Sequence, residues 1–170
     1  NRHYTTEDYL RRCGILRKWF DHPAITTDVI AGFPGETEEE FEETRRFLET
    51  VRFYEMHVFK YSKRQGTRAA VMEDQVSEQV KARRSDVLLE LEKTMSREYR
   101  ERFAGSRVSV LFEEAAEIGG KWYMIGRTPQ YVRAALPLED GMDREQLAGG
   151  IMELSASGLL NDEILKVEFS

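Results

Sequence analysis

The feature that most constrains the fold is a short apolar run that ends in a glycine-proline turn and leads at once into a helix start. Residues 25–31 are rich in Ile, Thr and Val, which is typical of a buried strand. Two glycines and a proline in residues 32–35 favour a turn, and Thr37 with Glu40 has the pattern of a capping box. The stretch therefore predicts one βα unit. In (β/α) barrels the loops that follow the strands bind ligands, although most glycine-rich turns only reverse the chain.

The segments on either side extend this unit into an α/β layer. A second capping box, Thr5 with Asp8, begins a first helix. The helix after the turn is expected over residues 38–50, and a second strand over residues 55–62. The order helix, strand, helix, strand with short connections predicts two neighbouring parallel strands. Two strands cannot close a barrel, so we expect residues 1–76 to be a piece of a (β/α) barrel.

A long helix is predicted over residues 77–104, with Ser77 as its cap. Its apolar stripe is explained by amphipathic packing and comprises Val80, Val87, Leu88, Leu91, Met95 and Phe103. The basic residues beside the stripe, Lys81 and Arg84 among them, are balanced by acidic ones and are predicted to be solvated. The glutamates that begin the preceding helix are likewise expected to stabilise the helix dipole rather than to bind a metal.

Beyond Gly105 the apolar pattern changes from helical to alternating. Strands are predicted at about residues 108–112, 121–126, 131–136, 150–156 and 160–169. Turn signals separate them at residues 119–120, 128–129, 140–141 and 157–158. Residues 105–170 are therefore predicted to form a small all-β barrel of the oligonucleotide-binding type.

Composition excludes several classes of protein. The net charge of −6 argues against a chain that binds nucleic acid over its whole surface, so a nucleic-acid site would have to be local. Cys13 is the only cysteine, which excludes an internal disulfide framework, and its helical spacing with Tyr9 and Leu16 predicts a buried apolar role. No apolar run has transmembrane length and no signal peptide is visible, so we expect a cytoplasmic protein. Because the chain does not begin with Met, we expect it to start inside a longer gene product.

Two stretches resemble consecutive motifs of the radical S-adenosylmethionine methylthiotransferases. They are Thr27-Asp28-Val29-Ile30-Ala31-Gly32-Phe33-Pro34-Gly35-Glu36-Thr37 and His57-Val58-Phe59-Lys60-Tyr61-Ser62-Lys63-Arg64-Gln65-Gly66-Thr67. Gln75-Val76-Ser77 and Arg2-His3-Tyr4-Thr5 resemble the family as well. The likeness is dense from Arg2 to about Arg107 and looser beyond, where the family carries a small RNA-binding barrel called TRAM.

The resemblance implies a fold and a function. Residues 1–76 would be the C-terminal part of a radical SAM partial (β/α) barrel, 77–104 a connecting helix and 105–170 a TRAM-like barrel. The variant His57-Val58-Phe59 is most similar to the MtaB-type branch, which acts on N6-threonylcarbamoyladenosine at tRNA position 37. The isopentenyladenosine and ribosomal-protein branches are less similar.

Such enzymes use S-adenosylmethionine and two [4Fe-4S] clusters, and the clusters require thiolate ligands that this chain lacks. Cys13 matches none of the ligand positions of the family. The resemblance therefore implies a C-terminal fragment that has no catalytic residue and no metal site. We expect this chain alone to be inactive and to hold neither cofactor.

The resemblance also implies cofactor-binding positions. The first motif falls on the radical-SAM pattern Gly-x-Ile-x-Gly-x-x-Glu with two departures, since Asp28 replaces the first Gly and Glu36 lies one place late. The following strand helps to hold the adenine of the cofactor. The predicted cofactor-binding residues are Asp28, Ile30, Gly32, Glu36, Phe59 and Tyr61, although strand residues of these types are more often part of a core.

RNA-binding positions are predicted in both parts of the chain. Lys60 and Arg68 stand where the family often has Pro and are expected to meet substrate phosphate. In the barrel, basic and aromatic residues interleave, a composition suited to single-stranded RNA, here a tRNA anticodon stem-loop. These residues are Lys121, Trp122, Tyr123, Tyr131 and Arg133. The acidic tail from residue 138 to 169 opposes RNA, so the contact surface should lie on the opposite side.

Two other readings stay open at this point. The chain also fits a free-standing RNA-binding β-barrel module with a helical extension and no enzymatic role. A third reading is a regulatory or assembly fragment of an unrelated α/β enzyme. In each case the exposed strand edges of the first part offer a route to dimerisation.

Overall fold

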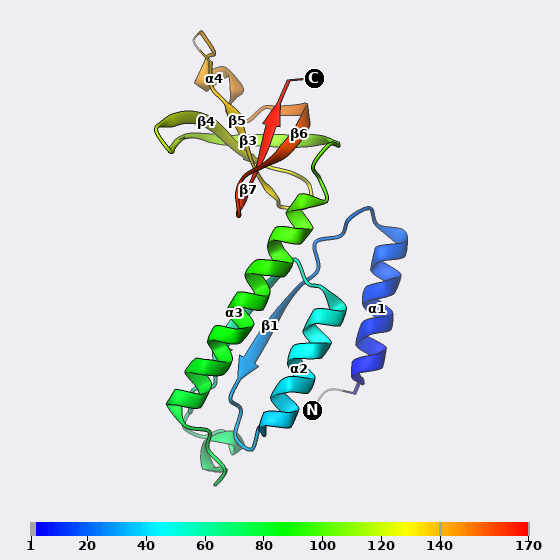
Figure 1. The fold of residues 1–170 in the computed structure, drawn as a ribbon, viewed down its shortest axis with the longest axis vertical. Helices are drawn as coiled ribbons and strands as arrows, with labels where there is room; N and C mark the ends of the chain where they lie inside the picture. Colours follow the sequence, from blue (N-terminus) through cyan, green and yellow to red (C-terminus); the bar gives the residue numbers. More distant parts are fainter. Residues whose placement is uncertain (1–2, 140, 170) are drawn as a thin grey trace. The chain divides into compact units, whose positions relative to one another are not determined.

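The computed structural model describes residues 3–139 and 141–169, so Arg2 and Asp140, named above, lie outside the described residues. The chain divides into two compact units: residues 1–95, here unit 1, and residues 96–170, here unit 2. Unit 1 is built of helices and a two-stranded parallel sheet, and unit 2 is a closed β-barrel (Figure 1). The expected fold class, α/β followed by a long helix and a small all-β barrel, is confirmed. The domain boundaries stay predictions.

Unit 1 alternates helices and strands in the predicted order. Its elements are α1 (Thr6–Trp19), β1 (Thr26–Ala31), α2 (Glu38–Val51), β2 (Glu55–Lys60), the short 3₁₀ helix η1 (Arg68–Val71) and the first part of α3 (Glu78–Glu101). β1 and β2 pair in parallel, with Ile30 opposite Phe59. The parallel pairing predicted from the short connections is confirmed.

Both capping boxes form and fix where the helices begin. The backbone N–H of Glu40 donates to Thr37 Oγ1 at 3.2 Å, and the Glu40 carboxylate accepts from the Thr37 N–H at 2.9 Å. Thr5 and Asp8 make the same reciprocal pair at the start of α1. Each box satisfies helix N–H groups that have no partner within the helix, and this is why the sequence signal located both starts correctly.

The core of unit 1 lies on one face of the two-stranded sheet. Side chains from all three long helices pack there with those from both strands. They include Cys13 of α1, Val29 of β1, Leu48 of α2, Met56 of β2 and Leu88 of α3. Because side chains alternate along a strand, the other face is left to Asp28, Ile30, His57 and Phe59, all of which are exposed. The sheet is therefore covered on one side and open on the other.

One prediction about the helices of unit 1 is wrong. Lys81 and Arg84, expected on a solvated face of α3, are each only 3% exposed. They are buried because this turn of α3 packs against the loop after β1. Glu78 of α3 compensates the charge of Lys81, and Glu36 of the loop compensates that of Arg84. Cys13 is buried as predicted, whereas Leu16, which shares its helical spacing, lies exposed.

Unit 2 is a barrel of strands joined edge to edge in the order β3-β4-β5-β7-β6. The strands are β3 (Arg107–Ile118), β4 (Lys121–Arg127), β5 (Arg133–Pro137), β6 (Ile151–Asn161) and β7 (Ile164–Glu168), and a short helix α4 (Arg144–Leu147) lies between β5 and β6. The pairing is antiparallel except between β5 and β7. Buried apolar side chains such as Val110, Ile125 and Leu165 belong to its core.

The barrel departs from the predicted strand limits at several places. β3 continues to Ile118, beyond its predicted end near residue 112, and residues 160–161 belong to β6 rather than to the last strand. Ser157-Gly158, predicted as a turn, lies inside β6, where a register shift between Ala156 and Gly158 marks a bulge. Tyr131, predicted to begin a strand, instead lies in the turn before β5 with a φ of 63°. The turn signal at Gly158 thus corresponds to a bulge inside a strand, and the strand signal at Tyr131 corresponds to a turn with positive φ.

Candidate functional site

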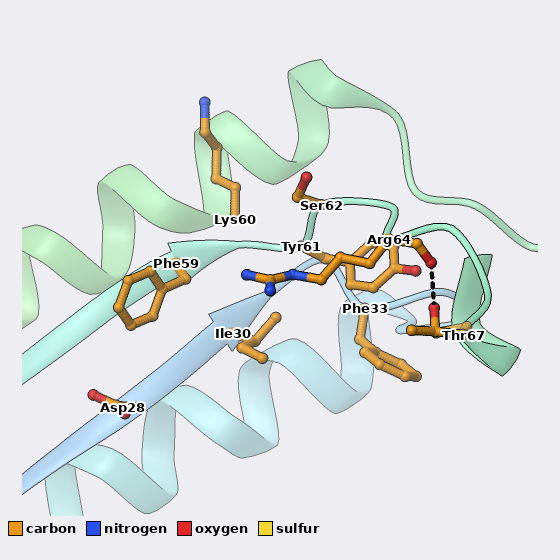
Figure 2. Close-up of a pocket in the computed structure, with 10 residues that line it drawn as sticks. Asp28, Ile30, Phe33, Phe59, Lys60, Tyr61, Ser62, Arg64 and Thr67 are labelled. Atoms are coloured by element: carbon orange, nitrogen blue, oxygen red, sulfur yellow. Dashed lines mark hydrogen bonds between the residues drawn. The ribbon is translucent and has the colours of Figure 1, made fainter.

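The open face of the β1–β2 sheet forms one side of a groove of about 580 Å³ (Figure 2). The strands supply Asp28, Ile30 and Phe59, the turn after β1 supplies Phe33, and the loop after β2 supplies Tyr61 and Arg64. The groove therefore lies at the carboxyl ends of two parallel strands. Ligands bind at this end in (β/α) barrels.

The floor of the groove is apolar and solvent-accessible. Ile30 and Phe59 are 52% and 53% exposed and are paired across the two strands. Phe33 and Tyr61 meet edge to face, with ring centroids 5.3 Å apart. Apolar walls of this kind favour a flat, weakly polar ligand such as a nucleobase.

Polar groups lie around this floor. Asp28 is on β1, and Figure 2 shows the Arg64 side chain extending from the loop back over the strand ends. The carbonyl of Arg64 accepts from Thr67 Oγ1 at 2.8 Å and from the Thr67 N–H at 3.2 Å, which closes the turn around Gly66. The loop that carries Arg64 is therefore tied at its base, and one carboxylate and one guanidinium are available to a ligand.

A buried ion pair holds the turn between β1 and α2. Arg84 Nη1 donates to Glu36 Oε2 at 2.7 Å and to the Glu36 carbonyl at 3.0 Å. The same carboxylate oxygen accepts from the Gly32 N–H at 2.8 Å. The side chains of Arg84 and Glu36 are 4% and 14% exposed. The Glu36 carboxylate is therefore committed to the turn and to α3.

Glu38 extends this network. Its Oε2 accepts from Arg83 at 2.6 Å and from Arg84 at 3.1 Å. The hydrogen bond from Arg83, followed by that from Arg84, lowers the pKa of Glu38 from its ordinary value of 4.5. The acid-rich start of α2 thus serves as an anchor for α3.

Gly32 is required by packing as well as by backbone conformation. Its φ is +73°, and a Cβ at this position would lie 2.4 Å from Lys81 Cγ. The Lys81 amine in turn pairs with Glu78 at 2.8 Å and lies 5.3 Å from the Tyr61 ring centroid. Sequence reasoning missed both Lys81 and Arg84. The sequence did contain one signal for Arg84. The basic pair Arg83-Arg84 follows an earlier helix, α2, that begins with several acidic residues.

The structure distributes the other predicted residues of unit 1 unevenly. Ile30, Phe59, Tyr61 and Asp28 come together in the groove, whereas Gly32 and Glu36 lie in the turn beside it. Lys60 borders the groove, but its side chain points away from Ile30 in Figure 2, toward a second hollow that it shares with Lys81. Arg68 begins η1 and is exposed.

The predicted RNA-binding residues of unit 2 fall into two separate groups. Lys121 and Trp122 begin β4, whereas Tyr131 and Arg133 follow its other end. A strand of seven residues places these groups about 20 Å apart. Tyr123 is 6% exposed and belongs to the barrel core, so it offers no stacking surface.

Metal ligands are not grouped in the described part of the chain. Residues 3–139 and 141–169 contain no cluster of three His, Cys, Asp or Glu side chains that could hold a metal ion. Cys13 is 4% exposed, and burial raises the pKa of its thiol. Within the same residues, every helix is too short or too polar to cross a membrane.

No protein-family model matches the chain. Known proteins do. It is 47% identical over 128 residues to tRNA-2-methylthio-N(6)-dimethylallyladenosine synthase of Acetivibrio thermocellus, covering 75% of this chain and 26% of that protein. It is 44% identical over 133 residues to threonylcarbamoyladenosine tRNA methylthiotransferase MtaB of Bacillus subtilis, covering 78% and 30%. It is 42% identical over 117 residues to ribosomal protein uS12 methylthiotransferase RimO of Clostridium kluyveri, covering 69% and 26%.

These similarities relate the chain to the methylthiotransferases. The chain spans only about a quarter to a third of the length of these relatives. Relatives with three different named substrates match at similar identity, so the comparison does not distinguish the MtaB type from the others.

Proposed function

We propose that this homologue of the methylthiotransferases is a portion of a tRNA methylthiotransferase. This portion forms one side of the S-adenosylmethionine pocket and binds the tRNA. The observation that carries the proposal is the extent of the similarity. A match of 128 residues is longer than either unit, so it extends over parts of both. This disfavours a free-standing barrel whose helical extension has no counterpart in such enzymes.

The groove of unit 1 supplies the cofactor-facing surface. Ile30 and Phe59 provide an apolar floor of suitable size for an adenine ring, with Tyr61 and Asp28 beside it. Gly32 and Glu36 act one step away, by fixing the turn that carries Phe33. Bound S-adenosylmethionine would supply the sulfonium whose cleavage starts the radical chemistry. The residues of this chain orient it and exclude water.

The iron-sulfur clusters do not fit this chain. A [4Fe-4S] cluster is held by several thiolates, and the single cysteine lies buried in the helical core of unit 1. No step of the reaction is therefore assigned to these residues, and the chain alone is expected to be inactive.

The proposed substrate is a tRNA anticodon stem-loop that carries N6-threonylcarbamoyladenosine. The name of one relative supports a tRNA substrate of this type, and His57-Val58-Phe59 on β2 favours it over the other substrates that the relatives' names give. Lys60 and Arg68 are exposed cations near the groove and would meet phosphate. Unit 2 would hold the RNA elsewhere.

A chimera tests the proposal. The segment of the Bacillus subtilis relative that matches this chain is replaced by this chain, and methylthiolated nucleosides are measured in cellular tRNA by mass spectrometry. We expect the methylthiolated adenosine to be restored in a strain that lacks the native enzyme. Substituting Ile30→Glu should abolish the product, because a charge would enter the apolar floor of the groove.

Val71→Glu is the matched control, because Val71 is 81% exposed and does not line the groove. It should leave the product unchanged. A soluble chimera that incorporates its clusters but makes no methylthiolated nucleoside would refute the proposal. An active Ile30→Glu chimera would refute only the part of the proposal that assigns the groove to the cofactor.

A further inference from the structure

One row of side chains crosses the outer surface of the barrel on four neighbouring strands. The strand register places Arg133 of β5 opposite Arg127 of β4, Arg127 opposite Leu111 of β3, and Leu111 opposite Ile151 of β6. Residues directly opposite in a sheet project to the same face. Leu111 and Ile151 are 44% and 70% exposed, so this face is the outer one. Two cations therefore adjoin two exposed aliphatic side chains.

The turn between β4 and β5 holds an aromatic ring above this row. The Tyr131 N–H donates to the Thr128 carbonyl at 2.9 Å, and the Thr128 N–H donates to the Val132 carbonyl at 3.0 Å. Thr128 and Val132 are 4% and 0% exposed and so anchor the turn in the core. Tyr131 itself has a φ of 63°, which a non-glycine residue rarely adopts, and is 71% exposed. A fixed backbone thus presents the ring to solvent.

A hollow of about 260 Å³ is lined by Leu111, Glu113, Arg127, Tyr131 and Ile151 among others, and Arg133 lies next to Arg127 on the neighbouring strand rather than in the lining. This volume suits one nucleobase rather than a larger ligand. Arg127 Nε pairs with Glu113 Oε1 at 3.3 Å, which orients the guanidinium while leaving its other donors for a ligand. The combination of a ring, an apolar wall and two arginines matches the two parts of a nucleotide, its base and its phosphate.

The opposite end of β4 is less suited to a base. The Arg144 guanidinium lies 4.3 Å from the ring centroid of Trp122 and covers a face of the indole. The residue opposite Trp122 in β3 is Glu117, for which no ion pair is found among the described residues, so its carboxylate would repel phosphate. The Glu113 carboxylate at the hollow beside Tyr131 is instead paired with Arg127.

We propose that the corner formed by Arg127, Tyr131 and Arg133 binds one unpaired nucleotide of an RNA strand, and that Trp122 does not. The base lies against Tyr131 and the Leu111–Ile151 wall, and the phosphate meets the two arginines. The inference rests on the proposed function insofar as that function gives unit 2 an RNA ligand.

The test measures binding of the whole chain to a fluorescently labelled anticodon stem-loop, by anisotropy at several salt concentrations. Tyr131→Asn removes the ring but keeps a residue that tolerates positive φ. It should weaken binding by about tenfold or more, as loss of a base-stacking ring does. Tyr131→Phe should bind like the wild type. Arg127→Gln with Arg133→Gln should weaken binding and flatten the salt dependence.

Trp122→Ala is the matched control and should bind within about twofold of the wild type. Thermal unfolding of each variant establishes that the barrel is intact. If the wild-type chain binds but Tyr131→Asn is unchanged, or if Trp122→Ala loses affinity instead, the inference is overturned and the proposed function stands. If the wild-type chain binds no RNA, the RNA part of the proposed function is overturned together with the inference.

Discussion

At the scale of single residues, the buried guanidinium of Arg84 is a group whose loss we expect to destabilise unit 1. It neutralises Glu36 and also donates to the Glu36 carbonyl and to Glu38. Removing one member of a buried ion pair leaves the other charge without compensation in a poorly solvated place. The effect on stability should therefore be much larger than for an exposed arginine on the same helix.

We expect Arg84→Met to lower the free energy of unfolding of unit 1 by about 3–5 kcal/mol. Arg83 is the matched control, since its side chain is 55% exposed and its ion pair with Glu38 lies at the surface. Arg83→Met should cost no more than about 1 kcal/mol, as exposed ion pairs do. Urea unfolding followed by circular dichroism measures both. Equal losses for the two variants would contradict the role assigned to the buried pair.

Individual residues also show what sequence reasoning reached. Cys13 was correctly predicted to be buried, because its neighbours at helical spacing are apolar. The burial of Lys81 and Arg84 does not follow from the sequence, because local patterning assigns charges to solvent. Lys81 is covered by a turn 49 positions away, although its acidic partner Glu78 is only three positions away, and the acidic partner of Arg84 lies 48 positions away. The same limit applies to Trp122 and Tyr131. The exposure of the Tyr131 ring depends on a turn conformation with positive φ, and a face of the Trp122 indole is covered by Arg144. The hydrophobic periodicity of the sequence reveals neither.

At the scale of elements, the contact between the β1–α2 turn and α3 depends on a missing side chain. Gly32 and Gly35 both have positive φ, but only Gly32 has a neighbour where its Cβ would lie. Alanine substitutions at the two glycines therefore distinguish two causes of destabilisation. Backbone strain acts at both positions, whereas a steric clash acts only at Gly32.

We expect Gly35→Ala to destabilise unit 1 by about 1 kcal/mol through backbone strain alone. Gly32→Ala should cost clearly more, because α3 must also move away from the turn. Adding Lys81→Ala to Gly32→Ala should recover part of the difference. Chemical unfolding of the four proteins checks this order, and equal effects of the two single glycine variants would rule out the packing role.

The same contact should respond to acid. A carboxylate whose pKa is lowered by folding stabilises the folded state above its ordinary pKa, and the stabilisation is lost as the pH falls through the folded value. For Glu38 this means full stabilisation above about pH 4.5 and progressive loss below it. Glu38→Gln should therefore flatten the decline of thermal stability as the pH falls below the ordinary pKa of 4.5. An unchanged acid profile would show that the pairing with Arg83 and Arg84 contributes nothing.

Element existence was more predictable than element limits. Capping boxes located the starts of α1 and α2, because they report backbone groups that must be satisfied in any fold. In unit 2, alternation located all the barrel strands, but β6 continues through Ser157-Gly158 by means of a bulge. A glycine permits either a turn or a bulge, and the choice is made by pairing with β7 rather than by local sequence.

At the scale of the whole chain, each unit has its own core, but the two are not equally complete. The barrel of unit 2 closes on itself and leaves no sheet edge unpaired among its strands. The sheet of unit 1 has two strands, an uncovered face with Ile30 and Phe59, and edges that are free to pair. Exposed apolar surface of this kind is typical of a surface that binds another molecule or segment.

We expect the chain to bind a hydrophobic dye such as ANS through this face. Ile30→Glu with Phe59→Glu should remove most of the fluorescence without loss of helical signal, because both side chains are about half exposed in the wild type. Trp19→Glu is the control, since Trp19 is 74% exposed and does not line the groove. If dye fluorescence survives in the double variant, the dye binds elsewhere and the expectation is wrong. Absence of fluorescence in the wild type would show that the apolar face is already covered in solution, for example by pairing of two chains.

The fit between Gly32 and Lys81 has an evolutionary consequence. The Lys81 side chain occupies the space that a side chain at position 32 would need, although 49 positions separate the two residues. Substitutions at the two sites should therefore be correlated among relatives. Lineages that keep glycine at the first site are free to keep a bulky residue at the second, whereas a lineage that acquires a larger residue at the first should already have lost bulk at the second.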